Sequence, residues 1–156
     1  MTNQSEVDRQ AAHRTFSAEC FNRAWDLMEK SERTGQEDEE MIRLSLASLW
    51  HWSQRPDCTS THEAIGTWQT ARIYALLGQA DNARRYGHLS LAASRQEGVP
   101  PFYLGYAYEA LARAELVAGN RDQMAIYLGE VRRAAVLVSE PEYRDQLLDD
   151  LNTIPT

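Results

Sequence analysis

Two arginines at matching positions of the chain, Arg72 and Arg113, are the residues best suited to chemistry. Arg113 follows Glu109 by four residues, so the two side chains can touch on one helical face. Aromatic residues stand close by, with Trp68 one helical turn before Arg72 and Tyr106 one turn before Glu109. An arginine fork beside aromatic rings suits a carboxylate or a peptide terminus. The alternative interpretation is an intramolecular ion-pair network that holds neighbouring helices together.

The spacing of the histidines and cysteines does not predict a metal site. None of them forms an H-x-x-x-H or a C-x-x-C motif, although two can still meet in the folded chain. We therefore predict no metal and no cofactor. The residues considered are His13, His51, His62, His88, Cys20 and Cys58.

The sequence also lacks the common catalytic motifs. It contains no G-x-S-x-G, no P-loop and no G-x-G-x-x-G. A catalytic group assembled from separate helices leaves no such trace in one sequence. We therefore favour a protein that binds rather than catalyses and keep an enzyme as an alternative.

The bulk composition indicates one globular domain spanning residues 1–156. The chain is 43% hydrophobic and 25% charged, which is enough to bury a core. Its formal net charge of −7 disfavours a nucleic-acid partner, because an acidic surface repels phosphates. The first residues are polar, and no apolar run approaches the ~20 residues that span a membrane. We expect a cytoplasmic protein with reduced thiols and no membrane contact.

Helical periodicity dominates the sequence and predicts an all-α fold. Thr34 with Glu37 and Ser60 with Glu63 have capping-box spacing, which marks the starts of two helices. Gly78 is a typical helix stop. On the second helix, Trp50 and Trp52 diverge by about 200°, so we expect one in the core and the other at a hairpin seam or a groove. The seven expected helices span approximately 6–30, 36–53, 61–77, 81–96, 101–118, 121–138 and 140–152.

An internal repeat supports stacked antiparallel hairpins. The pattern A-R-x5-G-x2-D-x4-Y starts at Ala71 and again at Ala112. Ala93 and Ala134 keep the same offset. Such repetition is typical of helical-repeat proteins, in which small residues let paired helices approach closely.

These residues resemble a tetratricopeptide repeat. The first unit matches best, and in the second Ala112 and Gly119 match whereas Glu115 and Met124 depart from the pattern. The resemblance implies a short right-handed solenoid in which the first helix of each pair lines a concave surface. On that surface we expect Trp68, Arg72, Tyr106, Glu109 and Arg113. The matching residues of the first unit are Ala71, Tyr74, Gly78, Ala83 and Ser90.

The whole chain is also similar to a group of uncharacterised bacterial proteins of this architecture. The resemblance implies the fold and no function. His51 lies in one of the matching stretches, and we include it among the candidate binding residues. Members often have histidine where this chain has Leu46, which argues against a histidine site there. The stretches are Phe21 to Trp25, Arg33-Thr34, Ala47-Ser48 with His51-Trp52, and Tyr106 to Arg113.

We interpret the sequence as a helical-repeat binding module for a peptide or protein partner. One alternative is a small-molecule-binding or catalytic protein with a pocket between its second, third and fifth helices. The other is a self-associating structural subunit, so a homo-oligomer stays possible. An open polar groove favours the first, a closed apolar pocket with convergent polar groups the second, and a large apolar patch on an outer helix the third.

Overall fold

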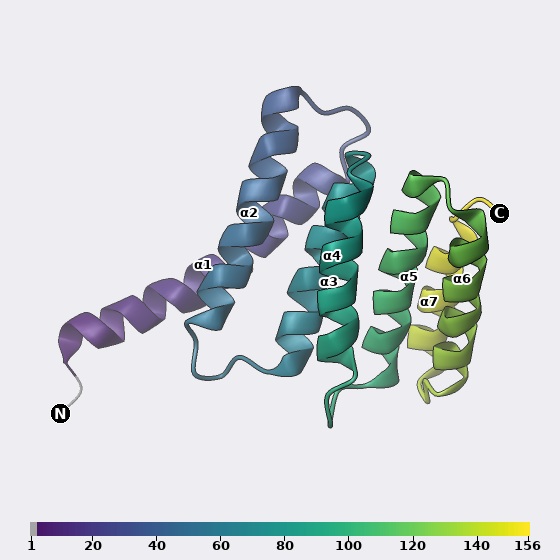
Figure 1. Ribbon diagram of the computed structural model, residues 1–156. Helices are drawn as coiled ribbons and strands as arrows, with labels where there is room; N and C mark the ends of the chain where they lie inside the picture. The colour runs from purple at the N-terminus through teal and green to yellow at the C-terminus, as the bar shows by residue number, and fades with distance from the viewer. Residues whose placement is uncertain (1–2) are drawn as a thin grey trace.

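A computed structural model describes residues 3–156 and confirms the all-α prediction, with seven helices and no strand in that range. The helices form stacked hairpins: α1 pairs with α2, α3 with α4, and α5 with α6, while α7 packs on α5 and α6 (Figure 1). The first turns of α1 project away from the other helices. The helices are α1 (Gln4–Met28), α2 (Gly35–Ser53), α3 (Ser60–Leu76), α4 (Ala80–Ser94), α5 (Pro101–Ala118), α6 (Arg121–Val136) and α7 (Pro141–Asn152).

Local capping chemistry explains where α2 and α3 begin. Thr34 and Glu37 form the expected capping box at the start of α2. The box expected at Ser60 and Glu63 is wrong, because the cap of α3 lies one residue earlier. There the Thr59 hydroxyl accepts the His62 backbone N–H, and Nδ1 of His62 accepts the Thr59 backbone N–H at 3.1 Å.

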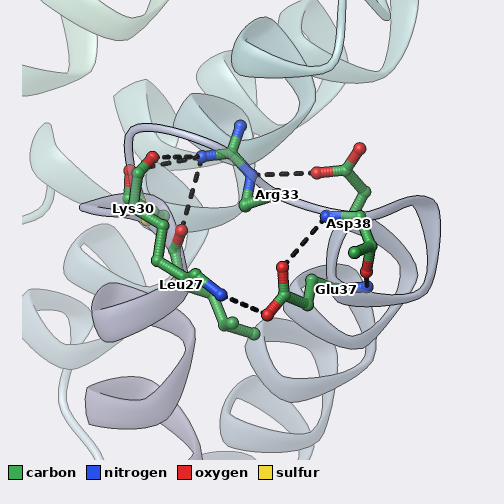
Figure 2. Close-up of polar contacts among 7 residues, drawn as sticks. Leu27, Lys30, Arg33, Glu37 and Asp38 are labelled. Carbon is green, nitrogen blue, oxygen red and sulfur yellow. Dashed lines mark hydrogen bonds and ion pairs between the residues drawn. The ribbon is translucent and has the colours of Figure 1, made fainter.

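The turn between α1 and α2 is closed by one arginine (Figure 2). Nη1 of Arg33 donates to the backbone carbonyls of Leu27, Met28 and Lys30, at the end of α1 where the i+4 helical hydrogen bonds stop. Nε of the same side chain donates to Asp38 on α2 at 2.9 Å. Arg33 therefore ties the end of one helix to the start of the next.

The core runs along α5, whose inward face carries small residues. Ala71 on α3 and Ala112 on α5 are both fully buried, as the repeat predicts. At the α4–α5 crossing, a Cβ added to Gly87 would lie 2.7 Å from Cδ2 of the fully buried Leu111. Glycine at this position therefore sets how closely the second hairpin approaches the third.

The two tryptophans of α2 differ from the sequence prediction. Trp50 is 57% exposed, and Trp52 is half-buried, with its ring stacked on that of His62 at 4.1 Å and the Arg55 guanidinium over it at 3.8 Å from the ring centre. Neither residue is in the core, because the inward positions of α2 are taken by smaller side chains such as Ser45 and Ser48. No helix within residues 3–156 is long and apolar enough to cross a membrane.

The glycine crossing makes a testable prediction. Gly87→Ala should lower the free energy of unfolding by about 1–3 kcal/mol, because the new methyl group overpacks against Leu111. Gly129→Ala is the matched control, since this mid-helix glycine of α6 has nothing within 4 Å of an added Cβ. It should raise stability by about 0.5–1 kcal/mol through its better helix propensity. Urea unfolding checks both, and equal effects in the two variants would contradict the packing at the crossing.

Candidate functional site

A fully buried carboxylate, that of Glu109, is the centre of the candidate site. Its Oε1 accepts Nη1 of Arg72 on α3 at 2.9 Å and also pairs with Nε of Arg113, one turn further along α5. Its Oε2 accepts the indole N–H of Trp68 at 3.1 Å. Three donors from two helices therefore compensate the charge of one buried acid.

Arg113 is committed to holding the helices together. Besides Glu109, its Nη2 donates to the backbone carbonyl of Asp150 at 3.1 Å and to the hydroxyl of Thr153 at 2.7 Å. These two acceptors lie at the end of α7, so the side chain bridges α5 and α7. The alternative interpretation, an intramolecular network, therefore describes Arg113 well.

Arg72 is placed differently. Its only hydrogen-bond partner among residues 3–156 is Glu109, reached through Nη1, and its side chain is 19% exposed. Its Nε and Nη2 donors remain available. Arg72 also lines the aromatic cavity described below.

The cavity lies between the odd-numbered helices and has a volume of about 450 Å³. Its walls are mainly aromatic: Trp25 of α1 packs on Trp68 with ring centres 5.7 Å apart, and Trp68 meets Tyr106 edge-on at 5.3 Å. Phe102 meets Tyr106 at 5.0 Å. The lining residues are Trp25, Ala64, Ile65, Trp68, Arg72, Phe102, Tyr103, Tyr106, Gln146 and Asp150.

The far wall of the cavity is fixed by a hydrogen bond between α5 and α7. The Tyr106 hydroxyl donates to Oδ2 of Asp150. Burial, followed by this bond to a carboxylate, raises the pKa of Tyr106 far above its ordinary value of 10. The phenol therefore stays protonated and holds Asp150 at the edge of the cavity.

His51 lies away from this cavity, at the contact between α1 and α2. Its Nδ1 lies 2.9 Å from Nδ1 of His13, so one ring donates to the other. The rings of Trp50 and Phe16 flank the pair. Burial, followed by the neighbouring His13, lowers the pKa of His51 below its usual 6.5. Within residues 3–156 no group of three or more histidine, cysteine or acidic side chains is arranged to hold a metal ion.

The structure thus separates the six predicted site residues into three sets. Trp68, Arg72 and Tyr106 line the cavity, Glu109 and Arg113 lie behind it, and His51 is elsewhere.

Sequence reasoning missed seven lining residues. Phe102 and Tyr103 precede Tyr106 by about one helical turn, as Ala64 and Ile65 precede Trp68, and that spacing was the available signal. No sequence signal locates the others, since they depend on where the first and last helices pack. They are Trp25, Gln146 and Asp150.

Comparisons of the chain with family models, curated proteins and solved structures found no match. The chemistry of the cavity is therefore inferred from its own residues.

The buried carboxylate gives a stability prediction. Glu109→Gln should lower the free energy of unfolding by about 2–3 kcal/mol, because two partly buried guanidinium groups lose their counter-charge. Glu130→Gln serves as the control, since its partner Arg133 is 75% exposed, and it should change stability by less than about 0.5 kcal/mol. Chemical unfolding measures both, and equal small losses would show that Glu109 is not the centre of the network.

The histidine pair predicts a pH effect. The folded-state pKa of His51 lies below its unfolded value of 6.5, so the unfolded chain binds the proton more readily. This contribution to stability is complete above about pH 6.5 and falls as the solution is acidified toward the lower, folded-state pKa. His51→Gln should remove this component, so its melting temperature should fall less than that of the parent between about pH 7.5 and 5.5. Identical pH profiles would contradict the assignment.

Proposed function

We propose that this chain is a binding module that accepts a group of a peptide or protein partner in the cavity between α1, α3, α5 and α7. The observation that supports this most is the cavity itself, with a volume of about 450 Å³ and five aromatic residues in its lining. Binding pockets in proteins commonly have volumes of about 300–1,000 Å³, apolar walls and a few placed polar groups. Aromatic walls provide a large apolar contact area at low entropic cost.

The placement of the cavity on one set of helices also favours a peptide or protein partner. All its lining residues come from α1, α3, α5 and α7, and none from the even-numbered helices. In tetratricopeptide repeats, which the chain resembles, the first helix of each pair lines the binding surface. A partner group seated here contacts three hairpins and α7 at once.

A free small molecule is the second candidate, and one observation favours it. The walls are aromatic, and three polar side chains converge on the space, namely Arg72, Gln146 and Asp150. That combination is typical of small-molecule pockets. Both candidates use the same cavity, so both predict the same effect of changing its walls.

Two single substitutions test the proposal. Trp25→Ala and Phe102→Ala each remove one wall of the cavity without touching Glu109, and both should keep a cooperative unfolding transition. The control is Trp50→Ala, an exposed tryptophan that does not line the cavity. The immobilised proteins are incubated with an extract of the source cell, and captured peptides, proteins and small molecules are identified by mass spectrometry.

The parent and Trp50→Ala should capture the same ligand. The two cavity variants should capture at least about tenfold less per folded molecule, since a buried aromatic side chain contributes about 1.5–3 kcal/mol. If all four proteins capture equally, or if capture falls only with the folded fraction, the cavity is not the binding site.

A further inference from the structure

Resting on the proposed function, we propose that the group bound in the cavity is an α-amino-acid unit with a free carboxyl group. Arg72 pairs with its carboxylate, Asp150 accepts its N–H, and the aromatic rings enclose its side chain. The carboxyl-terminal residue of a polypeptide and a free amino acid share this chemistry.

The first step concerns the donors that Arg72 has left. Nη1 is taken by Glu109, which leaves Nε and Nη2, the two parallel donors on one edge of the guanidinium group. That edge matches the two oxygens of a carboxylate. The chain uses it in this way elsewhere: Arg84 holds the buried Glu115 through Nε at 2.6 Å and Nη2 at 3.1 Å. Glu109 therefore fixes Arg72 while leaving its carboxylate-binding edge without a partner among residues 3–156.

The second step concerns the acceptor on α7. Asp150 holds the Tyr106 hydroxyl with Oδ2, and its Oδ1 receives no hydrogen bond from residues 3–156. It lines the same cavity as Arg72 but comes from a different helix, with α5 in contact with both α3 and α7. Two side chains that each keep polar atoms without a partner among residues 3–156, a donor on Arg72 and an acceptor on Asp150, therefore line one space. A simple anion would pair with Arg72 and leave Asp150 without a partner, whereas a ligand with both a carboxylate and an N–H would pair with both side chains.

The third step concerns the space between them. Trp68 and Tyr106 lie edge to face, with Trp25 and Phe102 packed against them. A large apolar or aromatic side chain fits such walls. In an α-amino acid the carboxylate, the nitrogen and the side chain are all attached to one carbon. This compact arrangement matches a donor edge, an acceptor and an aromatic wall around a single cavity.

The experiment varies the ligand first. Calorimetric titrations use Ala-Gly-Gly-X peptides with X as Phe, Trp, Tyr, Leu, Ile or Met, each as the free acid and as the carboxamide. Free Phe and 3-phenylpropionate, which lacks the nitrogen, complete the set. At least one free-acid peptide or free amino acid should bind, and its carboxamide should bind about tenfold or more weakly because it loses the charged pair with Arg72. Loss of the nitrogen should also weaken binding.

The second part varies the protein. Asp150→Ala should weaken binding of the free-acid ligand, whereas Asp149→Ala, at the exposed neighbouring residue, should leave the binding affinity unchanged. Melting temperatures separate loss of binding from loss of folding. A free-acid peptide that binds as tightly as the free amino acid identifies a polypeptide terminus as the source. Binding of the free amino acid alone identifies the small molecule.

Equal binding of acids and carboxamides, or no binding of any free acid, overturns this inference. The proposed function is judged separately by the capture experiment with the cavity variants. Ligand capture there that depends on Trp25 and Phe102 keeps the function even if these amino-acid probes fail. If ligand capture does not depend on Trp25 and Phe102, the proposed function is wrong.

Discussion

The rest of the site depends on how the chain accommodates one acidic side chain, that of Glu109, in a fully buried position. Removing such a charge from water costs several kcal/mol, which only close donors can offset. The chain provides three donors, from Trp68, Arg72 and Arg113. Because two come from α3 and one from α5, these helices can adopt only the register that brings all three to the same acid.

Unequal use of the two arginines gives the cavity its chemistry. Arg113 uses its remaining donors on the end of α7 and so ties α5 to α7. The Asp150 carboxylate is held at the cavity by the Tyr106 hydroxyl. Arg72 makes one side-chain hydrogen bond, from Nη1 to Glu109, so its Nε and Nη2 donors have no partner among residues 3–156. The network therefore holds helices together through Arg113, whereas its Arg72 side carries the donor edge that we propose binds a ligand.

The sequence predicted the elements of this fold better than the site. Hydrophobic periodicity marks each helix within a short stretch of sequence, and glycines such as Gly119, whose φ is positive in the structure, mark turns. The helices and turns can therefore be predicted from local sequence. The repeat predicts that Arg72 and Arg113 line one surface, but equal positions in two units do not imply equal partners, and Arg113 instead bridges α5 and α7. The i,i+4 spacing predicts the contact of Arg113 with Glu109, whereas only packing shows that Arg72 meets the same acid. The contacts of Trp25, Asp150 and the pair His13–His51 join residues far apart in the chain, and no local pattern encodes them.

The most direct measurement compares Arg72→Gln with Arg113→Gln in both unfolding and ligand capture. Arg113→Gln should lower the free energy of unfolding by about 2–3 kcal/mol, because it breaks contacts with Glu109, Asp150 and Thr153, and should keep capture per folded molecule. Arg72→Gln should lose less than about 1 kcal/mol, since Glu109 keeps two donors, yet should lose capture. If both variants lose stability equally, and capture falls only with the folded fraction, the two arginines do not divide their roles.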